Sequence, residues 1–190
     1  MNKIEIVIIF IVTILILFYI QKRYIEVAYV ESKLDNRKYL VQNIENKEVA
    51  ADMLAKLNEK ITKLLDHLSK KDPTNEDFLR LKNNYNVNNI SEGTENENYT
   101  SYSVNKGEQI VFCLRDRDQK KNFVDENVLM YVATHELGHL MTKEIGHTPT
   151  FWDNFKMLLE EALKINVYEH VDYSKNPIDY CGINIKSSII

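Results

Sequence analysis

The first apolar pattern in the chain is continuous. Residues 6–20 read IVIIFIVTILILFYI, with a single threonine as the only polar interruption. A helix needs about 17 to 25 residues to cross the hydrocarbon of a bilayer, and this segment reaches that length if its ends lie at the interfaces and Lys22 and Arg23 extend to the headgroups. The run predicts a transmembrane signal anchor over residues 1–24 that contacts lipid through residues 4–20.

Two other interpretations of this run are weaker. A cleaved signal peptide needs small residues at its cleavage site, whereas residues 18–26 are bulky or charged and the first alanine is Ala28. A buried helix that is apolar on every side would need a larger surrounding core than a chain of this length supplies. Basic residues after the run slightly outnumber those before it, so the positive-inside rule slightly favours a cytoplasmic body.

The second pattern is helical. Residues 31–71 lack glycine and proline, and their apolar positions follow spacings of mostly three, four and seven: Leu34, Leu40, Ile44, Ala51, Leu54, Leu57, Ile61, Leu64 and Leu68. Asp72-Pro73 ends this helix, and Thr74 with Asp77 three residues later begins a short second one. The pattern predicts a helical hairpin, a stalk over residues 25–90 that packs on its own domain. A coiled-coil dimer is the alternative, although the heptad drifts.

The remaining segments alternate between polar, β-prone and helical patterns. Residues 83–98 are polar and rich in Asn and Glu, which predicts a linker or long loop. Two β-prone runs, 99–104 and 109–114, surround an Asn-Lys-Gly-Glu turn and predict a hairpin. Residues 125–144 predict a buried helix.

The C-terminal part contains one further helix. Residues 149–165 predict it, with Pro149 in its first turn and a break at Ile145-Gly146 before it. The tail, residues 167–190, is aromatic without a clear period and predicts a wrapping segment with short strands.

Composition narrows the class of protein. The chain has 190 residues, which suits one ordinary domain with attachments. With 24 Lys and Arg against 28 Asp and Glu, the net charge of -4 argues against nonspecific nucleic-acid binding. Cys113 and Cys181 are far apart and lack CxxC spacing, so we expect free buried thiols. No pattern fixes an oligomeric state.

The candidate chemistry is concentrated at residues 131–141, which read YVATHELGHLM. His135 and His139 are four positions apart, so both imidazoles project from one side of a helix and can reach one tetrahedral Zn²⁺ at about 2.0 to 2.1 Å. Glu136 lies on the flank, where its carboxylate can accept a proton from an activated water. Burying these three polar residues in an apolar helix carries a desolvation cost that a metal offsets. The alternative is two core histidines and a solvated glutamate.

Catalytic zinc usually has three protein ligands, so a third must follow. His147 is the best candidate, because the chain reverses at the preceding glycine and can return the imidazole to the first two. Glu160 and Glu161, on the next helix, are the alternatives.

Three other residues, Asp153, Asp172 and Cys181, would each make the site a closed structural one if they supplied a fourth ligand. The candidate oxyanion donors are Tyr168, Tyr173 and His170.

These motifs together resemble those of the WLM and SprT-like zincin metallopeptidases. The resemblance rests on HELGH at 135–139 followed by GHTPTFW at 146–152. Further stretches are similar to short membrane-anchored members from large DNA viruses of eukaryotes: Asn105-Lys106-Gly107, Cys113-Leu114-Arg115, Asp172-Tyr173, Pro177 and Tyr180-Cys181-Gly182. The similarity spans about residues 78–185.

The resemblance implies an α+β fold in which residues 91–190 form a minimal zincin-like core, a small sheet over the HExxH helix. It implies that an extended protein or peptide substrate binds beside an edge strand, by β-augmentation. The implied activity is zinc-dependent peptide-bond hydrolysis by a single-pass protein of a host or virion membrane. The anchor and the absence of a basic tail differ from the branch that cleaves DNA-crosslinked proteins. The alternative is a membrane-tethered binding or assembly protein with a structural zinc site.

Overall fold

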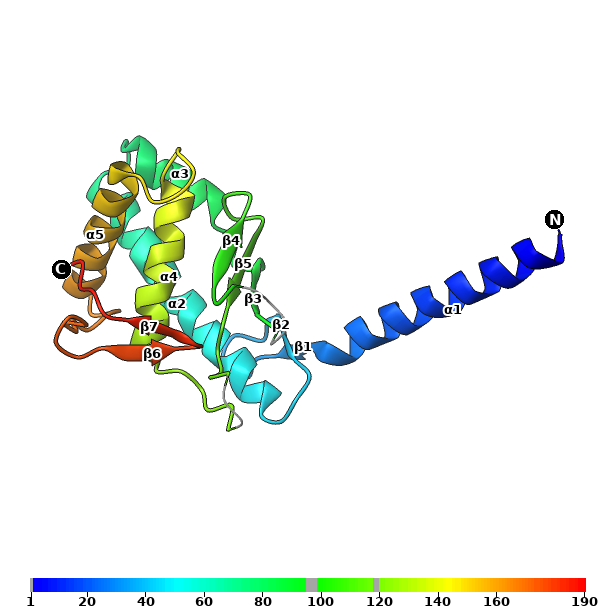
Figure 1. The fold of residues 1–190 in the computed structure, drawn as a ribbon. Helices are drawn as coiled ribbons and strands as arrows, with labels where there is room; N and C mark the ends of the chain where they lie inside the picture. Colours follow the sequence, from blue (N-terminus) through cyan, green and yellow to red (C-terminus); the bar gives the residue numbers. More distant parts are fainter. Residues whose placement is uncertain (1, 95–98, 118–119) are drawn as a thin grey trace.

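The computed structural model describes residues 2–94, 99–117 and 120–190, except for the side chains of residues 22–25. The chain forms a five-stranded sheet with helices packed against it, and a separate two-stranded ribbon near the C-terminus (Figure 1). Its elements in chain order are α1 (Lys3–Glu26), β1 (Val27–Glu31), β2 (Lys38–Gln42), α2 (Lys47–Lys71), α3 (Glu76–Asn84), β3 (Ile90–Glu92), β4 (Tyr102–Val104), β5 (Gln109–Phe112), α4 (Glu126–Met141), α5 (Pro149–Lys164), β6 (Ile178–Tyr180) and β7 (Ile183–Ile185).

The large sheet has the strand order β1-β2-β3-β5-β4, so β1 and β4 are its two edges. The three inner strands pair in parallel, whereas each edge strand pairs antiparallel with its neighbour. Helix α2 packs against β1, β2 and β3, and α4 packs against β4 and β5. The architecture confirms the α+β class and brings an edge strand beside the helix that carries HExxH.

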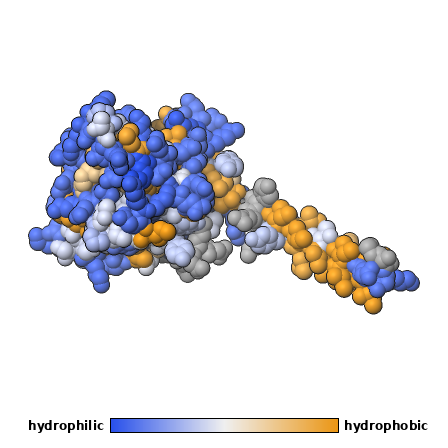
Figure 2. Space-filling view, turned by 90° about the horizontal axis from the view of Figure 1, so that it is seen from above, coloured by the Kyte–Doolittle hydropathy of each residue, from blue (hydrophilic) through white to orange (hydrophobic). Residues whose placement is uncertain are grey.

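Helix α1 extends away from the body of the protein (Figures 1 and 2). Asn2 caps it, because its side chain accepts a hydrogen bond from the backbone of Glu5 and its own backbone donates one to the Glu5 carboxylate. The segment Lys3–Gln21 is long and apolar enough to cross a membrane, by length and composition, and it is not buried within the described structure. The expected interfacial roles of Lys22 and Arg23 fall outside the described side chains.

The single helix predicted over residues 31–71 is wrong in its first part. Strand β2 occupies that part and pairs antiparallel with β1, with Val41 opposite Ala28, and the helix begins only at Lys47. In β2 the side chains of Tyr39 and Val41 are buried. This strand-like alternation covers only two positions, so it is hard to recognise beside the longer helical pattern that follows it. Pairing with β3 decides the conformation, since strand preference depends on neighbours in the sheet.

The linker predicted over residues 83–98 is also wrong within the described part of the chain, and residues 95–98 lie outside it. Ile90–Glu92 forms β3, the central strand of the sheet. Its buried carboxylate is paired, because Glu92 accepts hydrogen bonds from Arg115 Nε at 2.9 Å and from the Gln42 backbone at 2.7 Å. The low hydrophobicity of this segment therefore did not prevent its burial, because a charged side chain can be buried when it has a partner.

The hairpin, both later helices and the C-terminal strands are confirmed. Ser103 of β4 lies opposite Ile110 of β5, and Pro149 occupies the first turn of α5. Helix α4 ends at Met141 instead of residue 144. The short helix α3 is capped by Asn75, one residue after the predicted start.

Helix α2 is part of the interior. Leu54, Ile61 and Leu64 are fully buried on it, and they belong to the same hydrophobic core as Leu137 of α4. Side chains from both sides of the predicted boundary at residue 90 thus share one core. The division into parts 1–24, 25–90 and 91–190 stays a prediction.

Candidate metal and catalytic site

Helix α4 is fixed at its start and enclosed along its length. Asp125 accepts hydrogen bonds from the backbones of Asn127 at 2.8 Å and Val128 at 3.1 Å, which satisfies donors that the first turn of a helix leaves free. Most of its side chains are buried, and it packs against α2, α3 and α5. This enclosed helix gives His135 and His139 a rigid support.

The three histidines predicted as metal ligands lie together. His139 Nε2 is 3.2 Å from His135 Nε2, and His147 Nε2 is 3.1 Å from the same atom. One ligand atom from each ring lies within 4.8 Å of the others, and this group contains no fourth side chain among the described residues.

The segment between α4 and α5 returns His147 to the helix. After Met141 the chain leaves helical conformation, and Gly146 adopts a φ of 85°, which glycine accepts without strain. Thr148 then caps α5, accepting a hydrogen bond from the backbone of Phe151 at 3.3 Å. The reversal occurs over a short loop, residues 142–148, that ends one residue after the histidine.

Aromatic rings surround the imidazoles on the side of α5. The Phe151 ring stacks on His139 with centroids 4.4 Å apart, and Trp152 lies 5.3 Å from His147. Gly138 permits this approach, because a Cβ there would lie 3.0 Å from the Phe151 ring. These contacts restrict the orientation of the imidazole rings. They also exclude water from the side of the site that faces α5.

The environment keeps two of the imidazoles neutral. Burial lowers the pKa of His135 to about 3, with smaller contributions from His139 and His147. Burial also lowers the pKa of His139 to about 4, with contributions from His147 and Lys106. A neutral imidazole has a lone pair to offer a metal, whereas a protonated one has none.

The donor set fits zinc. Three nitrogen atoms bound at about 2.05 Å with tetrahedral angles lie about 3.3 Å from one another. The separations of 3.1 and 3.2 Å from His135 to its two neighbours are close to that value. Three imidazoles are also a usual ligand set for catalytic zinc, in which one position stays open.

Glu136 is buried beside the histidines, with 5% of its surface exposed. Burial raises the pKa of its carboxyl to about 7, and hydrogen bonds from the hydroxyl and the backbone of Ser103 in β4 act against that rise. The carboxyl therefore exchanges a proton near neutral pH, the range suited to a general base. It links the metal helix to the edge strand of the sheet.

An open cleft of about 720 Å³ runs between β4 and the histidines. It is lined by Tyr99, Ser101, Tyr102, Ser103, Asn105, Lys106, His135, Glu136, His139, Ile145, Gly146 and His147. One wall is thus the edge strand with its turn, and the other is α4 with the loop that follows it. The cleft is large enough for an extended segment of polypeptide.

Comparison with known proteins identifies the family of this chain. The profile of the WLM domain family matches residues 33–178, which is most of the chain. The chain belongs to the WLM domain family. This is a zinc metallopeptidase-like family, and the match begins well before the predicted boundary at residue 90.

Viral proteins are among the relatives of this WLM domain. An uncharacterized protein of Acanthamoeba polyphaga mimivirus is 36% identical over 181 residues, covering 93% of this chain and 91% of its own. A second, from Invertebrate iridescent virus 6, is 27% identical over 160 residues, covering 80% of this chain and 85% of its own.

A solved structure shares the fold. The crystal structure of Wss1 from Saccharomyces cerevisiae superposes with a TM-score of 0.52 at 22% sequence identity. The match covers 67% of this chain and 88% of that chain.

The alternative third ligands lie elsewhere in this WLM domain. Glu161 is buried and accepts hydrogen bonds from Lys71 at 2.7 Å and from Lys164 at 2.6 Å, and its other oxygen is 2.7 Å from His67 Nε2. It therefore connects α5 to α2. Glu160 is exposed, and neither glutamate belongs to the histidine group.

The proposed fourth ligands and oxyanion donors are also outside the cleft. Asp153 and Asp172 are not part of the histidine group. Tyr168 and Tyr173 are buried next to another tyrosine of α4, and His170 Nε2 is 3.0 Å from the Ile190 carbonyl oxygen. None of these side chains lines the described cleft.

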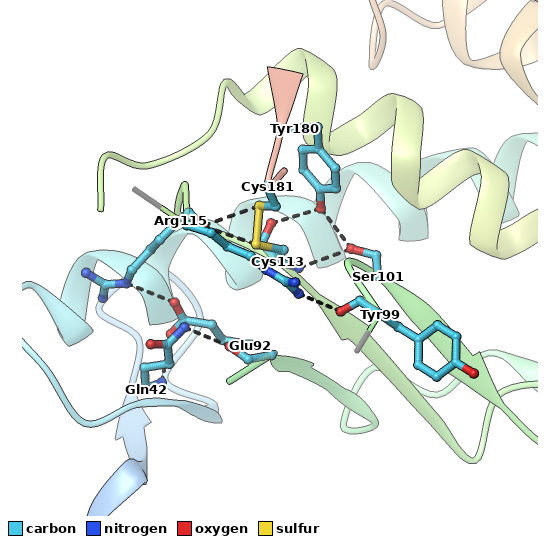
Figure 3. The surroundings of a disulfide bond; sticks show 10 residues. Gln42, Glu92, Tyr99, Ser101, Cys113, Arg115, Tyr180 and Cys181 are labelled. Carbon is cyan, nitrogen blue, oxygen red and sulfur yellow. Dashed lines mark hydrogen bonds and ion pairs between the residues drawn. A yellow bond between two sulfur atoms is a disulfide. The ribbon is translucent and has the colours of Figure 1, made fainter. Parts of the chain in front are cut away.

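The expectation of free thiols is wrong, because Cys113 and Cys181 form a disulfide (Figure 3). It joins the end of β5 to the turn between β6 and β7. Beside it the Tyr180 hydroxyl donates to the Cys113 carbonyl at 2.8 Å and lies 2.8 Å from the Ser101 hydroxyl (Figure 3). The C-terminal ribbon is thereby attached to the segment that leads into β4. The two cysteines are 68 residues apart in the sequence, so their spacing did not indicate that they pair.

Two residues near the site, Ser103 and Lys106, were assigned no functional role from the sequence. Ser103 contacts Glu136, and Lys106 donates hydrogen bonds to carbonyl oxygens at the end of α4. A serine in a short strand and a lysine in a turn are common on any surface. Only the packing of the hairpin on α4 distinguishes them.

Proposed function

We propose that this WLM domain is a zinc-dependent metallopeptidase that hydrolyses peptide bonds. One observation carries the proposal: three imidazole groups converge and, together with a buried carboxyl group, line an open cleft bordered by an edge strand. Membership of a zinc metallopeptidase-like family supports it.

The residues that would hold Zn²⁺ are His135, His139 and His147. Bound zinc supplies Lewis-acid chemistry that activates water near neutral pH and polarises a carbonyl group. The protein's contribution is to keep the first two imidazoles neutral by burial and to fix their orientation through Phe151.

Glu136 is the proposed general base and acid. Its carboxylate takes a proton from the attacking water and then gives that proton to the amine that leaves the scissile bond. Ser103 hydrogen-bonds this carboxylate, and both residues line the cleft. A group that exchanges protons near pH 7 can serve both steps.

The proposed substrate is an extended segment of protein. Strand β4 is an edge of the five-stranded sheet in the described part of the chain, and an edge strand suits β-augmentation. Tyr99 and Ile145, 69% and 91% exposed, present apolar side chains to the cleft. Glu136 and Lys106 are the only carboxylate and the only ammonium among the described lining residues. Uncharged, apolar side chains next to the scissile bond therefore fit best.

The test is Glu136→Gln in the full chain, with Glu160→Gln as a matched control on an exposed position. We expect the first variant to bind zinc like wild type and to lose cleavage of an unfolded protein, and the control to keep both. Turnover retained by Glu136→Gln would refute the assigned base. Zinc binding without cleavage in wild type, over many substrates, would favour the structural zinc alternative.

We further propose that α1 anchors the protein in a membrane. Its large apolar side chains between Ile4 and Ile20 are exposed, as the visible face in Figure 2 illustrates, and such exposure is costly in water and favourable in lipid. Extraction of membranes at alkaline pH should leave the full chain in the pellet, and release into the supernatant would contradict the anchor.

The disulfide bears on which side of that membrane the body occupies. The charge count slightly favours the cytoplasm, but disulfides persist mainly in oxidising compartments. We propose that the body faces the oxidising side. In sealed vesicles from the secretory pathway the body should resist protease added outside, and its digestion there would favour the cytoplasmic orientation.

A further inference from the structure

Lys106 makes an unusual set of contacts from the turn between β4 and β5. Its Nζ donates hydrogen bonds to three backbone carbonyl oxygens: those of His139 at 2.9 Å, Thr142 at 2.7 Å and Glu144 at 2.7 Å. The first belongs to the last turn of α4 and the other two to the loop 142–148. Its cation thus satisfies one carbonyl group that the end of α4 leaves free and two carbonyl groups of the loop.

The backbone at this position is strained. Lys106 has a φ of 59° and follows Asn105 at 44°. Asparagine tolerates this left-handed region, whereas a residue with a long side chain is uncommon there, and glycine would be the ordinary choice for the second position. The turn continues into Gly107, which lies close against the Asn84 backbone, since a Cβ there would lie 2.2 Å from the Asn84 carbonyl oxygen. The strain persists because the three hydrogen bonds offset it.

The loop that Lys106 holds is the one that carries His147. This imidazole is on an exposed residue outside any helix. Contacts hold both ends of this loop: Thr148 caps α5 at the far end, and Lys106 hydrogen-bonds the carbonyl groups of Thr142 and Glu144 at the near end.

We propose that Lys106 is a positioning residue for the metal site, which holds the loop 142–148 so that the His147 imidazole meets those of His135 and His139. The inference rests on the proposed metal site and does not require that the protein be a peptidase. Partners that orient a metal ligand contribute about 10- to 100-fold to metal affinity.

The test compares zinc affinity among variants of the full chain in detergent, by competition with a chelator. Lys106→Met keeps the length of the side chain and removes all three hydrogen bonds, so we expect zinc to bind about 10- to 100-fold more weakly. Lys106→Arg keeps a cation with several donors and should recover most of the affinity. Lys143→Met, in the same loop but 69% exposed at its side chain, is the matched control and should bind like wild type.

A second comparison isolates the route through His147. In a His147→Ala background, Lys106→Met should have little further effect, because the ligand that it positions is gone. Melting without metal checks that each variant folds, and Lys106→Gln replaces Lys106→Met if the latter fails that check. Wild-type affinity in the folded Lys106 variant, or an undiminished loss in the His147→Ala background, would overturn the proposal. Absence of peptidase activity in wild type would leave these zinc affinities, and hence this inference, unaffected.

Discussion

His147 Nε2 lies 3.1 Å from His135 Nε2, although a helix end and a chain reversal separate the two residues. The pair joins a rigid helix to a loop that has little regular structure of its own. A metal bound between them would therefore stabilise the loop as well as the site, since a ligand stabilises the state that binds it.

Replacement of His147 by alanine should abolish tight zinc binding. We expect a loss of more than about 100-fold, because a direct ligand contributes more than the groups that orient it. Trp152 is the only tryptophan, and its ring centroid lies 5.3 Å from that of His147. Quenching of its fluorescence by Co²⁺ therefore reports how much of the metal site is occupied. Glu161→Gln should bind metal like wild type. If Glu161→Gln lost tight zinc binding and His147→Ala kept it, the third ligand would be the glutamate.

Removal of the disulfide should destabilise the fold. With Cys113 and Cys181 both replaced by serine, we expect a loss of about 3 kcal/mol, or about 9 °C in melting temperature. A reducing agent should lower the melting temperature of wild type by a similar amount and leave the double variant unchanged. Equal melting of oxidised and reduced wild type would show that the bond does not hold the C-terminal ribbon.

The pairing of Glu161 predicts a loss of stability in acid. Burial alone would raise its pKa, but hydrogen bonds from Lys164, Lys71 and His67 outweigh burial and hold the pKa at about 2. The unfolded chain binds this proton near pH 4.5, so the stabilisation is complete above that pH and disappears as the pH falls toward 2.

The variant Glu161→Gln separates this contribution from other acid effects. At pH 6 it should be about 2 kcal/mol less stable than wild type, the range for a hydrogen bond to a charged group. The difference should shrink steadily below pH 4.5. Thermal melting at several pH values measures it, and a difference that stays constant down to pH 2.5 would contradict the assigned ion pairs.

The exposed side chain of Ile145 should influence which peptides are cleaved. Ile145→Asp places a charge at the rim of the cleft, so cleavage of peptides with large apolar side chains should fall about 10-fold in kcat/KM. Zinc affinity should not change. Leu34→Asp, an exposed apolar position in the turn between β1 and β2, is the matched control. Equal kcat/KM in Ile145→Asp and wild type would remove Ile145 from substrate recognition.

How far the sequence could predict the fold differs between its elements. Helix α4 was predictable because its apolar residues and its two histidines repeat at helical spacing, a local property of consecutive residues. Strand β2 was predicted as helix, β1 as part of the stalk over residues 25–90, and β3 as a linker. Each has only three to five residues, and their conformation depends on hydrogen bonds to strands that are distant in sequence.

The candidate site shows the same division. The sequence by itself determined that His135, Glu136 and His139 occur on one buried helix, since their spacing and apolar neighbours are enough to specify it. The sequence favoured His147 over Glu161 as the third member of this group, and the tertiary structure brings its imidazole to the other two. Tertiary structure alone decided that Lys106 reaches the loop and that Cys113 meets Cys181. These contacts arise where separate elements pack, and the free energy of packing is not encoded in the spacing of neighbouring residues.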